Sequence, residues 1–390
     1  MYKRTLVSLA LIGVAATVHA QSSVTLYGAV DLALEYQTVR TGSTFAVNGK
    51  ESFTQIGMKS GTQAASRWGI KGVEDLGNGL KANFVYESGI NATTGASSGF
   101  KRRSTLGLSS QSWGALDLGR RSSPGSDAFA TIDPFESSYG MANLQMSMGS
   151  EFIRYSNMVM YTSPNWNGLT LGAGYSFDTQ VGIAKVPAST NQIQPTGAVP
   201  FSFETNNRTR AISLAAHYER GPIQLAAIWD RLMAPASLAL ESSKIDAWVL
   251  GATYDFKVVK LHAAYGQQIG GVVNIWETPS DVGMNTGGLG DLTTALFAPG
   301  ARSQSWMVGL SAPLSERTRV FTSVQQMVPG GSLKTSPIDQ LSSQTIASVG
   351  VSHSLSRRTG VYAYYAYGNN MAMLNGVKVS TLAVGLRHSF

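Results

Sequence analysis

The chain has 390 residues, of which 42 are glycine, 14% are charged and none is cysteine, and its formal net charge is +7. This composition excludes a disulfide scaffold and a cysteine-ligated metal site, and the absence of any block of basic residues argues against binding to nucleic acid. The length allows two ordinary domains, but a large closed sheet can reach it as one domain, and a mean hydropathy of −0.01 fits neither a charged soluble globule nor a helical membrane protein.

The first twenty residues have the pattern of a removable export signal. Lys3 and Arg4 form a basic start, the range 6–17 is a short apolar stretch, and the triplet Val-His-Ala at 18–20 places small residues at a cleavage position. A membrane anchor is the weaker alternative, because the apolar stretch is shorter than the ~20 residues that span a bilayer. Cleavage before Gln21 would leave residues 21–390 as one domain.

Residues 21–390 contain no apolar run long enough for a spanning helix, so this part could enter a membrane only as a closed barrel. Alternation with a period of two residues begins at once: Val24 and Leu26 fall on one face and Thr25 and Tyr27 on the other, as in a strand. The pattern returns in segments of about ten residues, many with an aromatic residue near one end. Sixteen such runs lie near 23–36, 53–74, 80–89, 100–110, 114–121, 152–162, 168–179, 204–219, 222–232, 243–256, 258–270, 302–312, 316–328, 343–354, 358–369 and 376–390.

The connections between these runs alternate in length. Short ones hold turn residues, as at 74–79 and 219–222, whereas long ones rich in Gly, Ser, Asn and Thr occupy 180–203 and 271–300. Short turns at one end and long loops at the other are typical of a transmembrane barrel, and a sandwich gives no reason for this segregation. Sixteen strands also make a barrel too wide for side chains to fill, so it must enclose water.

One long connection, about 122–149, differs from the others in composition. Phe129, Phe135 and Tyr139 give it apolar surface to bury, which argues against disorder. We expect it to fold into the barrel and narrow the lumen, and we call it the constriction loop. The predicted fold is therefore all-β: a 16-stranded antiparallel transmembrane β-barrel with an inward-folded third extracellular loop.

Several segments from the start to the end of the mature part of the chain resemble a known family. They are SSVTLYGAVD from Ser22, SRWGIKGVEDLGNGLKANFVYESG from Ser66, FKRRSTLGLSS from Phe100, WGALDLGR from Trp113, IRYSN from Ile153, YTSPNWNG from Tyr161, SRRTGVYAYYAY from Ser356 and the final VGLRHSF. Together they resemble the general diffusion porins of the Gram-negative outer membrane, in particular those of the beta-proteobacterial type. The resemblance implies a water-filled channel for passive diffusion of small hydrophilic solutes and ions.

The resemblance also implies partners. It predicts a homotrimer embedded in outer-membrane lipid and lipopolysaccharide, and a final strand ending in Phe390 resembles the signal that the outer-membrane assembly machinery recognises; an ordinary aromatic residue at the membrane interface would give the same pattern. No nucleic acid and no cofactor is expected. The spacing of the loop carboxylates gives no support for a structural divalent ion.

Strand phase indicates which charged residues face the lumen. Because Trp68 and Ile70 would face lipid, Arg67 and Lys71 would face inward, and the same reasoning on the run near 100–110 places Arg103 inside. Arg154 follows the constriction loop directly. By resemblance, Arg67, Arg103 and Arg154 match the arginines that line one side of the constriction in this family, and we call them, together with Lys71, the basic wall.

Acidic residues on the loop face the basic wall in that family, and here they would be Asp127, Asp133 and Glu136. The loop sequence DPFESSYG departs from the Pro-Glu-Phe-Gly run of enteric porins, so the resemblance does not decide which of these carboxylates reach the lumen. An excess of arginine over carboxylate favours a weak anion preference.

Two other functions compete with the open channel. An outer-membrane enzyme is disfavoured, because a barrel hydrolase needs a serine and an oriented histidine at one rim, and no such pattern surrounds the histidines of the mature part, His217, His262, His353 and His388. A substrate-specific outer-membrane channel remains the alternative, since its specificity would depend on details of the lumen that strand phase does not resolve.

Overall fold

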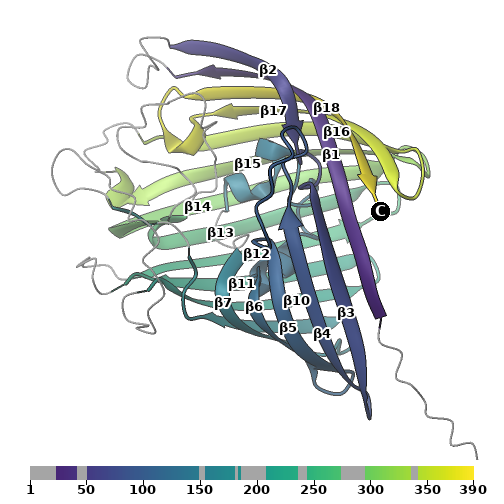
Figure 1. Ribbon diagram of the computed structural model, residues 1–390. Helices are drawn as coiled ribbons and strands as arrows, with labels where there is room; N and C mark the ends of the chain where they lie inside the picture. The colour runs from purple at the N-terminus through teal and green to yellow at the C-terminus, as the bar shows by residue number, and fades with distance from the viewer. Residues whose placement is uncertain are drawn as a thin grey trace, which may run out of the picture.

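The computed structural model describes residues 23–41, 51–148, 154–180, 183–185, 208–235, 244–273, 295–334 and 341–390. The predicted signal peptide, most of the long connection after residue 180 and most of the connection at 271–300 lie outside these ranges. The described residues form a single large sheet that closes on itself as a barrel (Figure 1). Among these residues, no helix is long and apolar enough to cross a membrane.

The barrel strands follow one another around the wall as antiparallel neighbours. They are β1 (Ser23–Arg40), β2 (Ser52–Ser60) with β3 (Arg67–Gly77), β4 (Leu80–Gly89), β5 (Arg103–Ser110), β6 (Gly114–Ser122), β7 (Arg154–Thr162), β8 (Leu169–Ser176), β10 (Arg210–Arg220), β11 (Ile223–Met233), β12 (Lys244–Asp255), β13 (Lys260–Val273), β14 (Ala295–Pro313), β15 (Thr318–Gly331), β16 (Gln344–Ser354), β17 (Thr359–Asn369) and β18 (Lys378–Ser389). Each of the sixteen predicted runs corresponds to one position in this wall, which confirms the 16-stranded antiparallel barrel.

Closure joins the two ends of the sheet. β1 pairs with β18 from Ala29↔Ser389 to Arg40↔Lys378, and Gly28 and Phe390 exchange two backbone hydrogen bonds of 3.1 Å each. A short additional strand, β9 (Ile183–Lys185), lies parallel to β14 and is not part of the wall's antiparallel order.

One predicted strand is interrupted. The run near 53–74 consists of β2 and β3, which both pair with the same side of β1. Between them β1 advances by three residues, from Ala29 to Leu32, while the partner chain advances by seven, from Ser60 to Arg67. Four extra residues therefore leave the wall here, and we call the segment 61–66 the wall turn.

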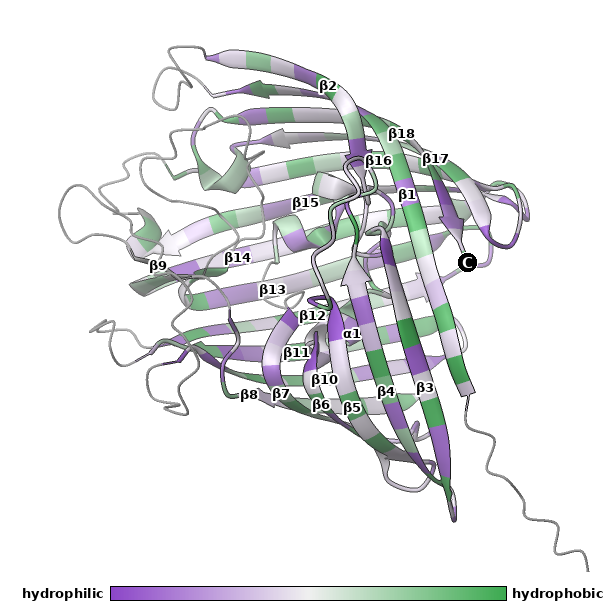
Figure 2. Ribbon diagram, in the orientation of Figure 1, coloured by the Kyte–Doolittle hydropathy of each residue, from purple (hydrophilic) through white to green (hydrophobic). Residues whose placement is uncertain are grey.

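The outer surface of the barrel is apolar and the inner surface is polar or covered. On β18, Leu382, Val384 and Leu386 are about half exposed, whereas the alternating Thr381 and Ala383 are buried. Figure 2 shows the same alternation of hydrophobic and hydrophilic bands along most strands. This is the reverse of a soluble sandwich, and it is the arrangement that a barrel surrounded by lipid requires.

Candidate functional site

The constriction loop folds into the barrel, as Figure 1 shows for its short helices inside the wall. It begins with α1 (Pro124–Phe129), which Ser123 caps by accepting a hydrogen bond of 3.2 Å from the Ser126 amide. It continues through η2 (Gly140–Ala142) and η3 (Leu144–Met146). Because α1 contacts β8, β10 and β11, and η2 contacts β16 and β17, the loop runs along the inner surface of that half of the barrel.

An apolar underside holds the loop against the wall. Phe135 and Tyr139 are at most 1% exposed and pack on Phe321 of β15, with ring centroids 4.9 and 5.0 Å apart. Two glycines make this close approach possible: a Cβ on Gly251 would lie 2.9 Å from the Phe129 ring, and one on Gly309 would lie 2.7 Å from Pro134. The loop is thus packed like a small hydrophobic core inside the barrel.

Polar side chains of the wall satisfy the backbone carbonyls of the loop. One such donor comes from each of four consecutive strands, β13 to β16. The contacts are His262 Nδ1 with Ile132 O at 2.8 Å, Ser305 Oγ with Ser147 O at 2.6 Å, Gln325 Nε2 with Asn143 O at 2.9 Å and Gln344 Nε2 with Met146 O at 2.6 Å. Buried carbonyls that would otherwise lack partners are bonded in this way, which fixes the position of the loop.

Asp133 was expected to be a lumen-facing carboxylate, but it lies buried inside the loop. It is 2% exposed, and its oxygens accept hydrogen bonds from the amides of Phe135 (2.9 Å), Ser137 (3.0 Å) and Leu144 (2.9 Å). Burial raises the pKa of the Asp133 carboxyl to about 6, although the three amides act in the opposite direction. Its role in the structure is to organise the loop, because it presents no surface to the lumen.

The other two loop carboxylates are exposed but paired. Asp127 accepts from the guanidinium of Arg121 at 2.5 Å, so it is bound close to the base of the loop. Glu136 is 59% exposed and lies 2.7 Å from Arg319 of β15. Each of these two negative charges therefore has a positive partner on or beside the wall.

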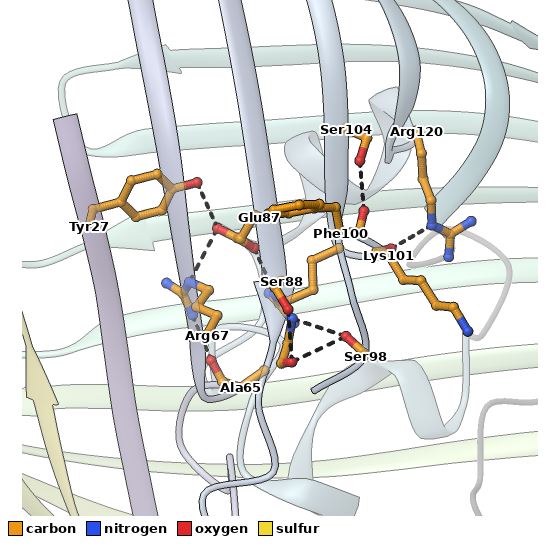
Figure 3. A network of polar contacts seen from close by, with 12 residues as sticks. Tyr27, Ala65, Arg67, Glu87, Ser88, Ser98, Phe100, Lys101, Ser104 and Arg120 are labelled. Carbon is orange, nitrogen blue, oxygen red and sulfur yellow. Dashed lines mark hydrogen bonds and ion pairs between the residues drawn. The ribbon is translucent and has the colours of Figure 1, made fainter. Parts of the chain in front are cut away.

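The basic residues lie on the other side of the lumen, on β3 to β7. The strand register places Tyr27, Gly69, Glu87 and Arg103 in one line across β1, β3, β4 and β5. Glu87 accepts from Tyr27 Oη at 3.1 Å (Figure 3). It also accepts from Arg102 Nε at 2.6 Å. Gly69 permits this approach, since a Cβ there would lie 2.9 Å from the Tyr27 hydroxyl.

Arg67 and Lys71 of the predicted basic wall both project into this network. Arg67 Nε lies 3.5 Å from Glu87 Oε2, and its guanidinium also donates to Ala65 O at 3.0 Å (Figure 3). The Lys71 ammonium lies 5.4 Å from the centre of the Tyr27 ring. Both positions agree with the strand phase that placed Trp68 and Ile70 on the outer face.

Arg103 belongs to a second network on β5 and β6. It lies 3.4 Å from Asp117, which Arg121 also contacts. Arg120 donates to Lys101 O at 2.5 Å (Figure 3) and to Ser156 Oγ at 2.8 Å. Arg154, the first residue of β7, is within electrostatic reach of Arg67, Arg102, Arg120 and Glu87.

These groups carry an excess of positive charge. We call the six arginines on or beside β3 to β7 the arginine cluster; they are Arg67, Arg102, Arg103, Arg120, Arg121 and Arg154. The carboxylates that contact them are Glu87, Asp117 and Asp127, so six positive charges stand against three negative charges. Such an arrangement attracts anions and disfavours cations at the same place.

Sequence reasoning did not identify Glu87, Asp117, Arg120 and Arg121 as site residues. The signal was present for two of them, because Glu87 alternates with outward-facing Tyr86, and Asp117 lies between the outward-facing Leu116 and Leu118. Within the described ranges, no group of three or more His, Cys, Asp or Glu residues is arranged to hold a metal ion.

Comparison with known proteins agrees with this geometry. The sequence profile of the Gram-negative porin family matches residues 6–372. An outer membrane porin protein of Bordetella pertussis is 37% identical over the full length of both chains, and outer membrane porin protein 32 of Delftia acidovorans is 29% identical over 98% of this chain and 92% of its own.

Solved structures show the same fold. The anion-selective porin from Comamonas acidovorans superposes with a TM-score of 0.65 at 26% identity, covering 95% of this chain and all of that one. OmpF of Salmonella typhi, at 15% identity and a TM-score of 0.61, shares the barrel. With a closed 16-stranded barrel, an inward loop, opposed charged groups and a family match over most of its length, the chain belongs to the Gram-negative porin family and is an outer-membrane channel rather than an enzyme.

Proposed function

We propose that this porin is a general diffusion channel with a weak preference for anionic solutes. The observation that carries the proposal is the charge excess of the arginine cluster, together with the pairing of both exposed loop carboxylates. Small hydrophilic anions would be concentrated at the cluster, and apolar solutes would gain nothing from displacing the oriented water there. The anion selectivity stated for the Comamonas acidovorans porin, which is 26% identical, supports this reading.

Within this proposal, Arg67, Lys71, Arg103 and Arg154 attract the anion, and Asp127 and Glu136 limit the excess charge. Asp133 acts indirectly, because it holds the loop together. Neither a cofactor nor a metal ion has a part in it.

The test is the reversal potential of the purified channel in a planar bilayer under a salt gradient. Changing Arg67, Arg103 and Arg154 together to Ala should abolish the anion preference. The matched control changes Arg317, Arg357 and Arg358 to Ala, since these three are exposed at hairpin turns and carry the same total charge. Equal shifts in the two triple variants would contradict the proposal, because net charge alone would then explain the selectivity.

We propose further that the chain assembles as a homotrimer through the face formed by β1 and β2. Among the described residues β2 pairs only with β1, so its other edge is open, and its outward side chains Ile56 and Met58 are 71% and 62% exposed. An open strand edge beside exposed apolar side chains favours pairing or packing with another chain, so we expect a second copy to cover this one. Ile56→Asn with Met58→Asn should weaken the trimer on semi-native electrophoresis, whereas Leu250→Asn on β12, which is 54% exposed, should not.

The remaining partners follow from the outer surface. Its apolar residues would contact outer-membrane lipid and, in the outer leaflet, lipopolysaccharide. Phe390 is 46% exposed at the end of β18, where the assembly machinery could bind it before the barrel closes. Deletion of Phe390 should lower the yield of folded trimer in the outer membrane without changing the conductance of the channels that form; an unchanged yield would count against this role.

A further inference from the structure

A buried carboxylate on β1 lies where the constriction loop meets the wall. Asp31 is fully buried, and the strand partner of β1 is interrupted beside it by the wall turn. Its Oδ2 atom accepts hydrogen bonds from the amides of Gln63 (3.1 Å) and Ala64 (2.9 Å), and its Oδ1 atom accepts from Tyr362 Oη at 2.6 Å. One side chain thus binds β1, the wall turn and β17 together.

The backbone of Asp31 holds the same turn. Its amide donates to Ser66 Oγ at 3.0 Å, Ser66 Oγ is also 3.0 Å from the Asp31 carbonyl, and that carbonyl accepts from the Gly61 amide at 2.9 Å. Both ends of the wall turn are therefore fixed to one residue. Charge-assisted bonds to buried backbone amides are the stronger class of hydrogen bond, so the turn is held firmly.

The wall turn also holds the constriction loop at Tyr139, which we call the loop tip. The Tyr139 amide donates to Thr62 O at 2.7 Å, and Gln63 Nε2 donates to Tyr139 Oη at 2.8 Å. Tyr139 also packs edge to face on Tyr362, with ring centroids 5.5 Å apart. Two of the residues that bind the Asp31 side chain from outside β1, Gln63 and Tyr362, therefore contact Tyr139 directly.

The same turn leads into the arginine cluster. Arg67 follows Ser66 directly, and its guanidinium donates to Ala65 O within the turn. The loop tip on one side and the first arginine of the cluster on the other are thus connected through six residues that Asp31 fixes.

We infer that Asp31 is the positioning residue of the constriction: by holding the wall turn it sets the distance between the loop tip and Arg67, and so the width and steadiness of the open channel. Asp31 does not contact the permeating solute. The inference rests on the proposed function, since it concerns the same constriction.

The test uses single-channel recording of the full-length mature porin. Tyr362→Phe removes the hydroxyl bonded to Asp31 and keeps the ring that packs on Tyr139. Loss of one charge-assisted bond should raise the fraction of time in substates of altered conductance by about tenfold or more. Asp31→Asn should act in the same direction, because it removes the charge that assists the bond from Tyr362 Oη, and the effect of the double variant should be smaller than the sum of the two single effects, because both changes act on that bond.

Tyr364→Phe is the matched control. Tyr364 lies two residues along β17, its ring centroid is 5.8 Å from that of Tyr139, and its buried hydroxyl has no hydrogen-bond partner among the described residues. Its removal should leave the current steady. If Tyr362→Phe records as steadily as Tyr364→Phe and the wild type, the inference is overturned, and this holds even if Asp31→Asn fails to fold.

The outcome is separable from that of the proposed function. Steadiness of the current tests Asp31, whereas the sign of the reversal potential tests the anion preference. A steady wild-type channel that prefers cations would contradict the proposed function and leave the role of Asp31 to be decided by the Tyr362→Phe recording.

Discussion

The constriction loop and the arginine cluster both carry charged side chains, but they differ in how far positive and negative charges are balanced. In the loop, Asp133 is buried, and Asp127 and Glu136 are each paired with an arginine. In the cluster, six arginines stand against three carboxylates, so charge of one sign is left over. We therefore propose that the loop sets the shape of the channel and that the cluster sets its electrostatic preference.

The largest effect should follow from removing the carboxylate that organises the loop. Asp133→Ala leaves three amides without this acceptor, two of them buried, and we expect the loop to lose roughly 3–5 kcal/mol of local stability. Glu136, Ser137 and Tyr139 have positive φ angles of 53°, 55° and 64°, which add strain that the carboxylate bonds offset. Hydrogen exchange of the Leu144 amide should accelerate more than about a hundredfold. Unchanged exchange would show that packing alone holds the loop.

The same residue predicts a dependence on pH. The pKa of Asp133 is raised by burial from 3.8 to about 6, so the folded loop binds this proton more tightly than the unfolded chain does. Proton binding to Asp133 therefore stabilises the folded loop by up to about 3 kcal/mol. This stabilisation is fully present below about pH 4 and is lost as the pH rises through 6. Compared with Asp133→Asn at each pH, the wild-type loop should gain stability on acidification from pH 7 to pH 4. A constant difference would contradict the raised pKa.

Filling the space beneath the loop should have an intermediate effect. Gly309→Val would place side-chain atoms against Pro134, and overpacking of this kind costs about 1–3 kcal/mol. The loop can yield only toward the lumen, so single-channel conductance should fall. Gly57→Val on β2 is the control, because a Cβ there has no atom within 4 Å. Equal conductance of the two variants would argue against a loop packed directly on β14.

The smallest effect on stability should come from the exposed ion pair. Glu136 and Arg319 are 59% and 37% exposed, so Glu136→Gln should change the free energy of unfolding by less than about 1 kcal/mol. It leaves the Arg319 charge without its partner, and the reversal potential should move slightly further toward anions. A movement toward cations would show that Glu136 does not act by neutralising Arg319.

The barrel was predictable because its signal is local. The two-residue period in β18 or β8 depends only on which face meets lipid, and the phase that put Arg67, Lys71 and Arg103 inside depends on the same rule. The interruption between β2 and β3 was not predictable, because it depends on contacts of the wall turn with Asp31 and Tyr139, which are distant in sequence.

The loop residues show the same limit. The loop has no strand phase, so no alternation of apolar and polar residues distinguishes Asp133 from Glu136. Asp133 accepts hydrogen bonds from three amides, whereas Glu136 faces the solvent. Its fold depends on contacts with Phe321, His262 and Gln325, more than a hundred residues away. Pairing of Asp127 with Arg121 arises only once the loop turns back on its own base.

In our proposal the arginine cluster, and not the loop, decides which ions the channel prefers. The most direct measurement is the reversal potential of the wild type beside that of Asp127→Asn with Glu136→Gln, in planar bilayers under the same salt gradient. We predict that the wild type prefers anions and that the loop variant prefers them somewhat more strongly. A wild-type channel that prefers cations would contradict this role of the arginine cluster.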